Sequence, residues 1–261
     1  AETDLDLGWY ERFLGINMTR DHYITTGQVY GNVISKEREG AYLGKCVQIV
    51  PNITDEIKRR IRLSAKKTKA EIIITEIGGT TGDIEGLPFL EAIRQFRLEE
   101  DYKNTLFVHV ALVPILETTK EQKTKPLQHS VNELRRIGIQ PDVIVARSPF
   151  MIENDVKNKI ALFANVAEKN VFSSPTISCI YELPIIFDSQ KMGDRISQRL
   201  SIPKKKPNWK TWRQVLKGYI QPKYRIRIAM CGKYTRLSDS YVSINEALQH
   251  AGAILQTKIT I

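Results

Sequence analysis

The sequence has few cysteines and no long apolar run. Its three cysteines, Cys46, Cys179 and Cys231, lie far apart in a chain of 261 residues, without the close pairing of a zinc site or the density of a disulfide scaffold. We therefore expect them to be reduced and structural. The apolar runs are short and interrupted by charge, and the first residues do not resemble a secretory signal, so we expect a cytoplasmic protein that does not enter a membrane.

The sequence also lacks the phosphate-binding motif G-x-x-x-x-G-K-[ST], in which backbone amides and a lysine hold nucleotide phosphates. The nearest approach, Gly40 to Cys46, has one residue too few between its glycines and ends in Cys where the motif needs Ser or Thr. It also precedes a predicted strand, where the motif requires a helix. Gly232-Lys233 has no glycine at the required upstream position. Neither segment can serve as this motif.

The charge balance is strongly basic. A formal net charge of +10 and a pI near 9.4 suit a polyanionic partner, either nucleic acid or nucleoside triphosphates. Most basic residues alternate with acids, as in residues 36–39, which is typical of a solvated helix face. No basic stripe is interleaved with the stacking aromatics that single-stranded nucleic acids require. The distribution therefore disfavours a nucleic-acid partner and leaves nucleotides.

Apolar runs rich in β-branched residues alternate with segments of helical period. The runs, which are candidate strands, cover residues 46–50, 72–75, 106–110, 142–146, 170–172 and 226–230. This alternation predicts parallel βαβ units, and hence an α/β fold with a mostly parallel sheet and helices on both faces. Local chemistry agrees, because Thr54 suits an N-cap, Pro88 suits a first helical turn, and Gly138 suits the end of the 127–137 helix.

The periodicity lapses after Leu200 through a segment rich in proline and lysine, and it resumes at Tyr224. We therefore predict a first domain over residues 1–200, a linker over residues 201–223, and the start of a second α/β domain over residues 224–261.

The loop at residues 76–85 combines three glycines with three carboxylates, directly after an apolar run. Glycine lets a backbone pass close to a ligand, while carboxylates bind divalent cations or accept hydrogen bonds from sugars and bases. The alternative is a turn in which Asp83 or Glu85 caps the next helix. Three carboxylates exceed what a cap requires, so we favour a ligand site.

Ligands of open α/β sheets gather at the carboxyl ends of the strands. Arg147 follows the predicted 142–146 strand, and the 106–110 strand leads to a segment containing Lys123, Lys125 and Gln128 before a helix. Two lysines and an amide could contact phosphates and a base edge. The alternative is that this segment is a solvated loop that binds no ligand. The residues alone do not decide between a nucleotide-binding segment and such a loop.

Three segments in the same order resemble CTP synthase. They are residues 1–13 (AETDLDLGWYERF), the 76–89 loop (EIGGTTGDIEGLPF) and residues 123–128 (KTKPLQ). The resemblance runs over essentially the whole chain, with an archaeal-like segment at residues 232–241. It implies an amidoligase (synthetase) domain of P-loop NTPase type, a linker, and the first part of a glutamine amidotransferase domain. By that comparison the chain starts after the family's phosphate loop and stops before the glutaminase residues.

The resemblance implies ATP-dependent amination of UTP to CTP, with ammonia from glutamine and with Mg²⁺ as cofactor. CTP is the expected feedback inhibitor, GTP the expected activator, and a homotetramer the expected assembly. The alternatives are a non-catalytic homologue that senses UTP or CTP and, from the basic charge alone, a nucleic-acid-binding module.

Site residues follow from the positions that match the family's motifs, and no catalytic side chain is assigned. The implied metal ligands are Asp6 and Glu76; the implied ATP contacts are Asp6, Arg147 and Ile177; and the implied UTP or CTP contacts are Asp83, Ile84, Glu85, Lys123, Thr124, Lys125, Pro126, Leu127, Gln128 and Lys159.

The chain departs from the family's pattern at several positions. Trp9 and Asn52 stand where the family usually has His, and Thr176-Ile177 replaces an Asp-Val pair near the adenine. Thr81 and Gly86 replace the usual Val and Ser. None of these changes falls on an implied metal or UTP residue. The Thr176 change, however, leaves it undecided whether this segment contacts the adenine of ATP.

Overall fold

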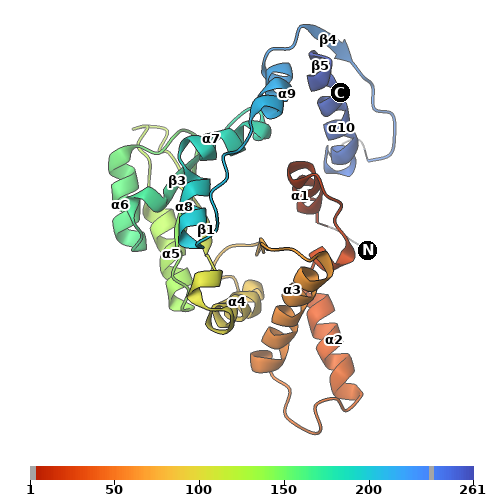
Figure 1. The fold of residues 1–261 in the computed structure, drawn as a ribbon, viewed down its shortest axis with the longest axis vertical. Coiled ribbons are helices and arrows are strands. Elements are labelled where there is room, and N and C mark those ends of the chain that lie inside the picture. Colours follow the sequence, from red (N-terminus) through yellow and green to blue (C-terminus); the bar gives the residue numbers. More distant parts are fainter. Residues whose placement is uncertain (1–3, 235–237) are drawn as a thin grey trace.

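A computed structural model describes residues 4–234 and 238–261 (Figure 1). Residues 1–3, which begin the first family-like segment, and residues 235–237, within the archaeal-like segment, lie outside the described residues. The ranges that follow account for every helix and strand of the described part.

A three-stranded parallel sheet forms the centre of the fold. Its strands are β1 (Val108–Leu112), β2 (Val143–Ser148) and β3 (Val171–Pro175), in that order. Val108 is paired in register with Val143, and Ile144 with Val171. The predicted parallel sheet is confirmed, and the predicted 106–110, 142–146 and 170–172 strands correspond to these three elements.

Helices cover both faces of this sheet, as predicted (Figure 1). On one face, α5 (Lys125–Arg136) and α6 (Asn154–Ala164) bury Val131 and Ile160 against Ile144 and Val171. On the other face, α7 (Leu183–Ser189) and α8 (Met192–Arg199) pack on β2 and β3. Each face therefore has an apolar core, as parallel sheets require.

Strand β1 lies at the edge of the sheet and is only half covered. His109 is buried on the α5 side, where its Nε2 lies 2.9 Å from Ser130 Oγ. Val108, Val110 and Leu112 alternate with the buried positions and are 42–62% exposed. We predicted mostly buried strands, and β1 differs because α7 and α8 cover only its two neighbours.

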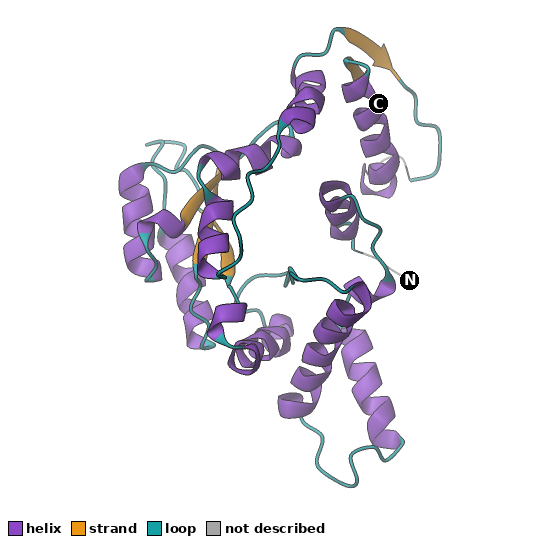
Figure 2. Cartoon of the chain, viewed as in Figure 1, coloured by secondary structure: helices purple, strands orange, loops and turns teal. Residues whose placement is uncertain are grey.

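The N-terminal part is helical. It contains α1 (Asp6–Leu14), α2 (Thr26–Arg38), α3 (Thr54–Thr68) and α4 (Leu87–Glu100). Apolar side chains of α2, α3 and α4 form a second core, separate from that of the sheet. A long segment without helix or strand then connects α3 to the turn before α4 (Figure 2).

The C-terminal part is a small βαβ unit. It consists of β4 (Tyr224–Arg227), α10 (Val242–Ile254) and β5 (Thr257–Thr260), and the two strands pair in parallel. Helix α9 (Lys210–Ile220) lies within the predicted linker and packs on α10, with the backbone at Gly218 against that at Ala253. The α/β character of this second unit agrees with the prediction, while the domain boundaries stay a prediction.

Short helices complete the chain. They are the π-helix η2 (Ile49–Ile53) and the 3₁₀ helices η1 (Arg20–His22), η3 (Ile84–Gly86), η4 (Tyr102–Asn104), η5 (Glu168–Asn170), η6 (Ile180–Glu182) and η7 (Ser238–Tyr241).

Two predicted strands do not form. Residues 46–50 lead into η2, and residues 72–75 have no regular structure. A strand needs a hydrogen-bonded neighbour, and within residues 4–234 and 238–261 no strand pairs with either segment. Ile72, Ile73 and Ile74 are consequently 57%, 40% and 86% exposed. Apolar sequence alone was therefore insufficient to predict a strand here.

Two of the three local predictions are confirmed. Pro88 lies in the first turn of α4, and Gly138 adopts φ +91° directly after the C-cap of α5, where a side chain would be strained. Thr54 is not the N-cap of α3. It is already helical, and its hydroxyl donates to the Pro51 carbonyl at 3.0 Å.

Candidate functional site

Three carboxylates gather near the start of α1. The backbone amide of Asp6 donates to Asp4 Oδ1 at 3.0 Å, which places the Asp4 carboxylate against the start of the helix. Glu76 comes from the long segment before α4. Desolvation and the negative charges of Asp6 and Asp4 raise the pKa of Glu76. The charges of Asp6 and Asp4 therefore act on Glu76, 70 positions after Asp6 in the sequence, and we call these three residues the acidic cluster.

Tyr10 belongs to the same cluster. It lies one helical turn after Asp6 on α1, so the two side chains share a face. Desolvation, followed by the charges of Glu76, Asp6 and Asp4, raises the pKa of Tyr10 to about 12. Its phenol therefore stays protonated at neutral pH and can donate a hydrogen bond. Sequence reasoning missed both Tyr10 and Asp4, and the spacing of Asp4, Asp6 and Tyr10 was the available signal.

The acidic cluster is suited to a cation. Carboxylates that repel one another gain from a divalent ion, and Mg²⁺ is commonly bound by one or two carboxylates together with substrate phosphates and water. Among the described residues, no group of three or more His, Cys, Asp or Glu side chains is placed to hold a metal by itself. Asp6 and Glu76 offer carboxylate oxygens, a ligand type that Mg²⁺ accepts, and phosphate and water would have to supply the remaining ligands.

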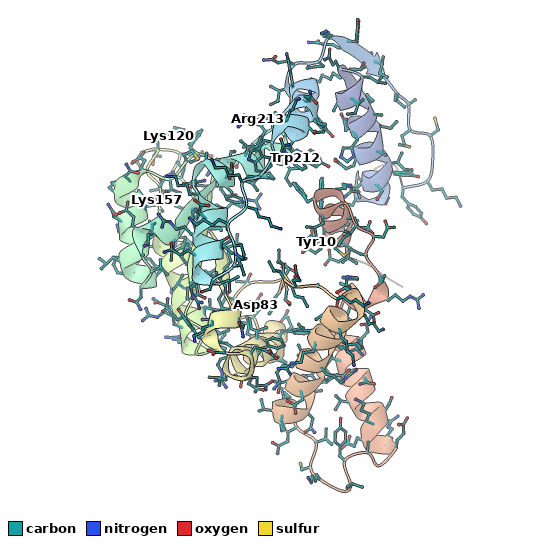
Figure 3. The ribbon with its side chains drawn as sticks, in the orientation of Figure 1. Tyr10, Asp83, Lys120, Lys157, Trp212 and Arg213 are labelled. Atoms are coloured by element: carbon teal, nitrogen blue, oxygen red, sulfur yellow. The ribbon has the colours of Figure 1, made fainter. Side chains whose placement is uncertain are left out.

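The Asp83 to Glu85 segment lies in the loop before α4 (Figure 3). All three side chains are exposed, and Ile84 is 81% exposed. Asp83 precedes η3 but makes no side-chain capping bond, and Gly86 precedes α4 without one. Capping, the alternative weighed for this loop, is therefore not what the structure shows.

Gly82 brings this loop against α5. It adopts φ +102°, and a Cβ at this position would lie 3.7 Å from the side chain of Glu133. Only glycine takes this conformation without strain. The loop that carries Asp83 thus rests on the carboxyl-terminal part of α5, about two turns away from Lys125 in the first turn.

The lysine segment forms the end of a turn and the first turn of α5. The Lys123 amide donates to the Pro114 carbonyl at 2.8 Å, and its ammonium lies 2.6 Å from Glu121 Oε2. Lys125 and Pro126 are exposed at the amino end of α5, where the helix dipole favours anions. These positions suit a phosphate.

The other members of this segment are buried. Gln128 Nε2 donates to Thr124 Oγ1 at 2.8 Å, and both residues are nearly inaccessible. Leu127 is fully buried in the core between α5 and the sheet. Its side chain therefore has a packing role, and only its backbone is left for the predicted nucleotide contact.

Lys159 lies on α6, one turn before Phe163. The ammonium of Lys125 lies 5.8 Å from the centre of the Phe163 ring. Lys159 and Phe163 are four residues apart on one helix and so share a face. The structure thus directs Lys125 and Lys159 toward the same side of α6.

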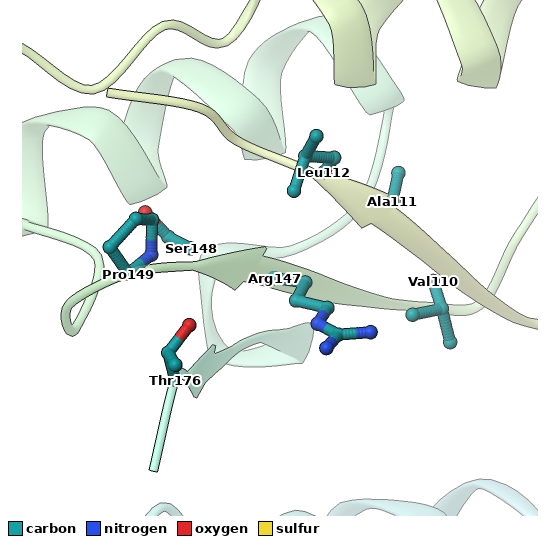
Figure 4. Close-up of a pocket in the computed structure, with 7 residues that line it drawn as sticks. All are labelled: Val110, Ala111, Leu112, Arg147, Ser148, Pro149 and Thr176. Atoms are coloured by element: carbon teal, nitrogen blue, oxygen red, sulfur yellow. The ribbon is translucent and has the colours of Figure 1, made fainter. Parts of the chain in front are cut away.

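Arg147 lines an open pocket of about 460 Å³ at the carboxyl ends of the strands (Figure 4). Leu112 and Thr176 line it from β1 and from the segment after β3. The Thr176 amide donates to the Ser148 carbonyl at 3.0 Å, and the half-buried Ile177 follows. Arg147 and Ile177, both predicted near ATP, therefore lie at one edge of the sheet, as the fold rule requires.

The predicted residues thus form four groups. They are the acidic cluster at α1, the lysine segment at the amino end of α5 with Lys159, the Asp83 to Glu85 loop against the carboxyl-terminal part of α5, and the pocket at Arg147. Within the described ranges, no hydrogen bond or ion pair joins one group to another. That two nucleotides span these groups stays a prediction.

Comparison with known protein families identifies the relatives of this chain. A family model described as the N-terminus of CTP synthase matches residues 1–202. This chain belongs to the CTP synthase family. The CTP synthase of Sulfurisphaera tokodaii is 54% identical over 258 residues, which cover 99% of this chain and 49% of that protein. The enzymes of Aeropyrum pernix and Thermus thermophilus are 55% and 50% identical, and the match covers 97% and 100% of this chain and 47% and 48% of those proteins.

The chain spans about half the length of these CTP synthases. The family confirms the resemblance seen in the sequence. Two departures from the family's usual residues have local structural roles here. Asn52 Oδ1 accepts the Gln48 amide at 2.9 Å, and the Trp9 ring lies under the Arg12 guanidinium at 4.8 Å. Asn52 and Trp9 therefore each make a local contact with another residue of this chain.

Proposed function

We propose that the protein converts UTP to CTP by ATP-dependent amination, with ammonia released from glutamine, as the final step of pyrimidine nucleotide synthesis in the cytoplasm. ATP transfers its γ-phosphoryl group to O4 of the uracil ring, which gives ADP and turns O4 into a leaving group. Ammonia then attacks C4, phosphate departs, and protons are lost to solvent. The observation that carries this proposal is the meeting of Asp6 and Glu76 in a chain of this family.

Asp6 and Glu76 would hold Mg²⁺, which supplies charge neutralisation for the transferred phosphoryl group. Asp4 adds negative charge beside them, and the protonated Tyr10 is a donor at the edge of the cluster. The family membership and the donor set support Mg²⁺. Among the described residues, no helix is both long and apolar enough to cross a bilayer.

The residues around the amino end of α5 would bind UTP. Lys123, Lys125 and Lys159 provide positive charge, and the amino end of α5 is a position that favours an anion. Asp83, Ile84 and Glu85 are exposed on the loop beside the carboxyl-terminal part of α5, and in this proposal they would contact UTP or the product CTP. Thr124, Pro126, Leu127 and Gln128 would shape the same turn.

Arg147 and Ile177 would contact ATP from the carboxyl edge of the sheet, and Asp6 would meet its phosphates through the cation. CTP would inhibit by occupying the UTP residues. Activation by GTP, a homotetramer, and the division into a synthetase domain, a linker and the start of an amidotransferase domain belong to the same proposal. The βαβ unit formed by β4, α10 and β5 supports the last of these.

Ammonia-dependent synthesis tests the proposal on the full-length gene product. With UTP, ATP, Mg²⁺ and saturating ammonia, CTP should form, and chelation of Mg²⁺ should stop its formation. Absence of CTP under these conditions would contradict the proposal. Binding of UTP or CTP that raises the melting temperature without turnover would point instead to a nucleotide sensor.

A further inference from the structure

Five rings from three distant parts of the chain surround Tyr181, which lies in η6. We name this the Tyr181 cluster. Its ring centres lie between 5.3 and 6.5 Å from that of Tyr181, and it comprises Trp9 and Phe13 from α1, Trp212 and Tyr219 from α9, and His250 from α10. Contacts at these distances are attractive beyond simple burial. Tyr181 itself is 7% exposed.

The hydroxyl of Tyr181 binds α10 through two polar partners. The hydroxyl donates to Glu246 Oε2 at 2.8 Å, and His250 Nε2 lies 2.7 Å from the hydroxyl oxygen of Tyr181. On the other side, Trp212 Nε1 donates to the Tyr181 carbonyl at 2.7 Å. Hydrogen bonds to a charged acceptor are stronger than neutral ones. Tyr181 therefore joins η6 to α9 and α10 by polar bonds as well as by packing.

Helix α1 depends on this cluster for its position. No residue of α1 is fully buried. The helix contacts Tyr181 through Trp9 and Phe13, and Arg12 Nη2 donates to Ser243 Oγ of α10 at 3.2 Å. Figure 1 shows α1 beside α10 and apart from the central sheet. The segments that fix α1 thus include the predicted start of the amidotransferase domain.

The same helix carries the acidic cluster. Asp6, Trp9 and Phe13 have the spacing i, i+3, i+7, which places them along one side of α1. A shift of α10 that moves Trp9 or Phe13 therefore moves Asp6 relative to Glu76, which comes from a different segment. The geometry connects the second α/β unit to the helix that carries a proposed metal ligand, through the Tyr181 cluster and the Arg12–Ser243 hydrogen bond.

We infer that the Tyr181 hydroxyl is a positioning group that couples α10 to α1, and so transmits the position of the second α/β unit to Asp6. This inference rests on the proposed function. Glutamine-dependent synthesis requires the two units to act together, whereas free ammonia bypasses the second unit. Loss of the coupling should therefore lower the glutamine-dependent rate more than the ammonia-dependent rate.

The test compares Tyr181→Phe with Tyr219→Phe in the full-length gene product. Tyr181→Phe removes the two polar contacts to α10 and keeps the ring. Tyr219→Phe is a matched control, because Tyr219 stacks on Tyr181 in the same cluster and its buried hydroxyl has no hydrogen-bond partner in the described part of the chain. The measurements are kcat and KM for UTP with glutamine and with ammonia, and amide deuterium exchange of residues 6–14.

For Tyr181→Phe we expect the ratio of glutamine-dependent to ammonia-dependent kcat to fall about tenfold, as suits the loss of hydrogen bonds to a charged partner. Amide exchange in α1 should rise by a similar factor. Tyr219→Phe should change neither. The inference would be overturned if Tyr181→Phe left the kcat ratio unchanged, whether because both activities were retained or because both fell equally. It would also be overturned if Tyr219→Phe lowered the ratio as much as Tyr181→Phe.

Deuterium exchange separates this inference from the proposed function. If the unaltered protein makes no CTP from ammonia, the proposed function fails, and the exchange of α1 still decides whether Tyr181 holds the helix. Unchanged exchange in Tyr181→Phe would then overturn the coupling by itself. Faster exchange in α1 with unchanged exchange in β2 would support it.

Discussion

Glu56 and Glu76 are both surrounded by charged groups, but their pKa values move in opposite directions. Burial would raise the pKa of Glu56, yet hydrogen bonds from Arg59 and Arg60 at 2.8 Å outweigh it and lower the pKa to about 2. Glu76 has no basic partner among the described residues, and desolvation, followed by the charges of Asp6 and Asp4, raises its pKa. The carboxylate of Glu56 is therefore paired with basic side chains, whereas the carboxylate of Glu76 has no such partner in the described part of the chain.

The difference separates a structural charge from a functional one. Glu56 is 3% exposed and also lies 3.3 Å from the ammonium of Lys36, so it joins α2 to α3. A buried carboxylate with several donors stabilises a fold, and it has nothing left to offer a ligand. Glu76, Asp6 and Asp4 repel one another, and a repelling group of this kind marks a candidate functional site. The predictions below test this contrast.

Replacement of Glu76 should have the largest effect. In Glu76→Ala, ammonia-dependent CTP formation should fall at least about a hundredfold, because a metal ligand is lost where several kcal/mol of charge stabilisation is expected. Glu71→Ala is the matched control, since Glu71 is an exposed glutamate of the same segment. Steady-state rates at saturating ammonia decide the matter. Retained activity in Glu76→Ala would move the cation site elsewhere.

Replacement of Glu56 should lower stability and leave the ammonia-dependent reaction intact at temperatures where the variant is folded. A pKa change from the ordinary value of 4.5 to about 2 corresponds to a stabilisation on the order of 3 kcal/mol at neutral pH. Glu56→Gln should therefore lower the free energy of unfolding by about 2–3 kcal/mol in urea, while the exposed Glu37→Gln should change it little. A loss below about 0.5 kcal/mol would show that the ion pairs contribute nothing net.

Acid should remove the same stabilisation. The pKa of Glu56 is lowered in the folded state, so its contribution is present above the unfolded value of 4.5 and is lost as the pH falls toward about 2. The difference in unfolding free energy between the unaltered protein and Glu56→Gln should therefore shrink between about pH 5 and pH 2. A difference that stays constant over this range would contradict the assignment to Glu56.

Replacement of Asp4 should have the smallest effect. In Asp4→Asn, one of the charges that raise the pKa of Glu76 is lost, so that pKa should fall toward its ordinary value. The pKa of Tyr10, about 12 in the unaltered protein, should fall as well. NMR titration of labelled glutamate and tyrosine side chains measures both. An unchanged Glu76 value would mean that Asp4 is not in the cluster.

The sequence predicted the fold where periodicity and turn chemistry agreed. The strands at residues 142–146 and 170–172 and the helix that ends before Gly138 were found because each has its partners within the chain. The apolar run at Ile72 to Ile74 was predicted as a strand from its composition, but it has no neighbouring strand to pair with in the described part of the chain. Pairing is a property of two segments, so one segment could not predict it.

The candidate site was predicted largely through the family resemblance. Asp6 by itself is an ordinary acid near Asp4, and only the fold shows that Glu76 lies close to it. Tyr10 was missed because its spacing of four residues from Asp6 points to a site only once the influence of Glu76 on Tyr10 is known. Leu127 was assigned to the nucleotide by motif, while the structure places its side chain in the core, because motif matching does not distinguish a contact from the packing behind it.

Titration with Mn²⁺ is the most direct test of the acidic cluster. Electron paramagnetic resonance would follow binding to the unaltered protein, to Asp6→Asn, to Glu76→Gln and to the control Glu71→Gln, each in the presence of ATP. The account predicts that Asp6→Asn and Glu76→Gln each weaken Mn²⁺ binding at least about tenfold, while Glu71→Gln does not. Equal affinity in all four proteins would contradict a cation held between Asp6 and Glu76.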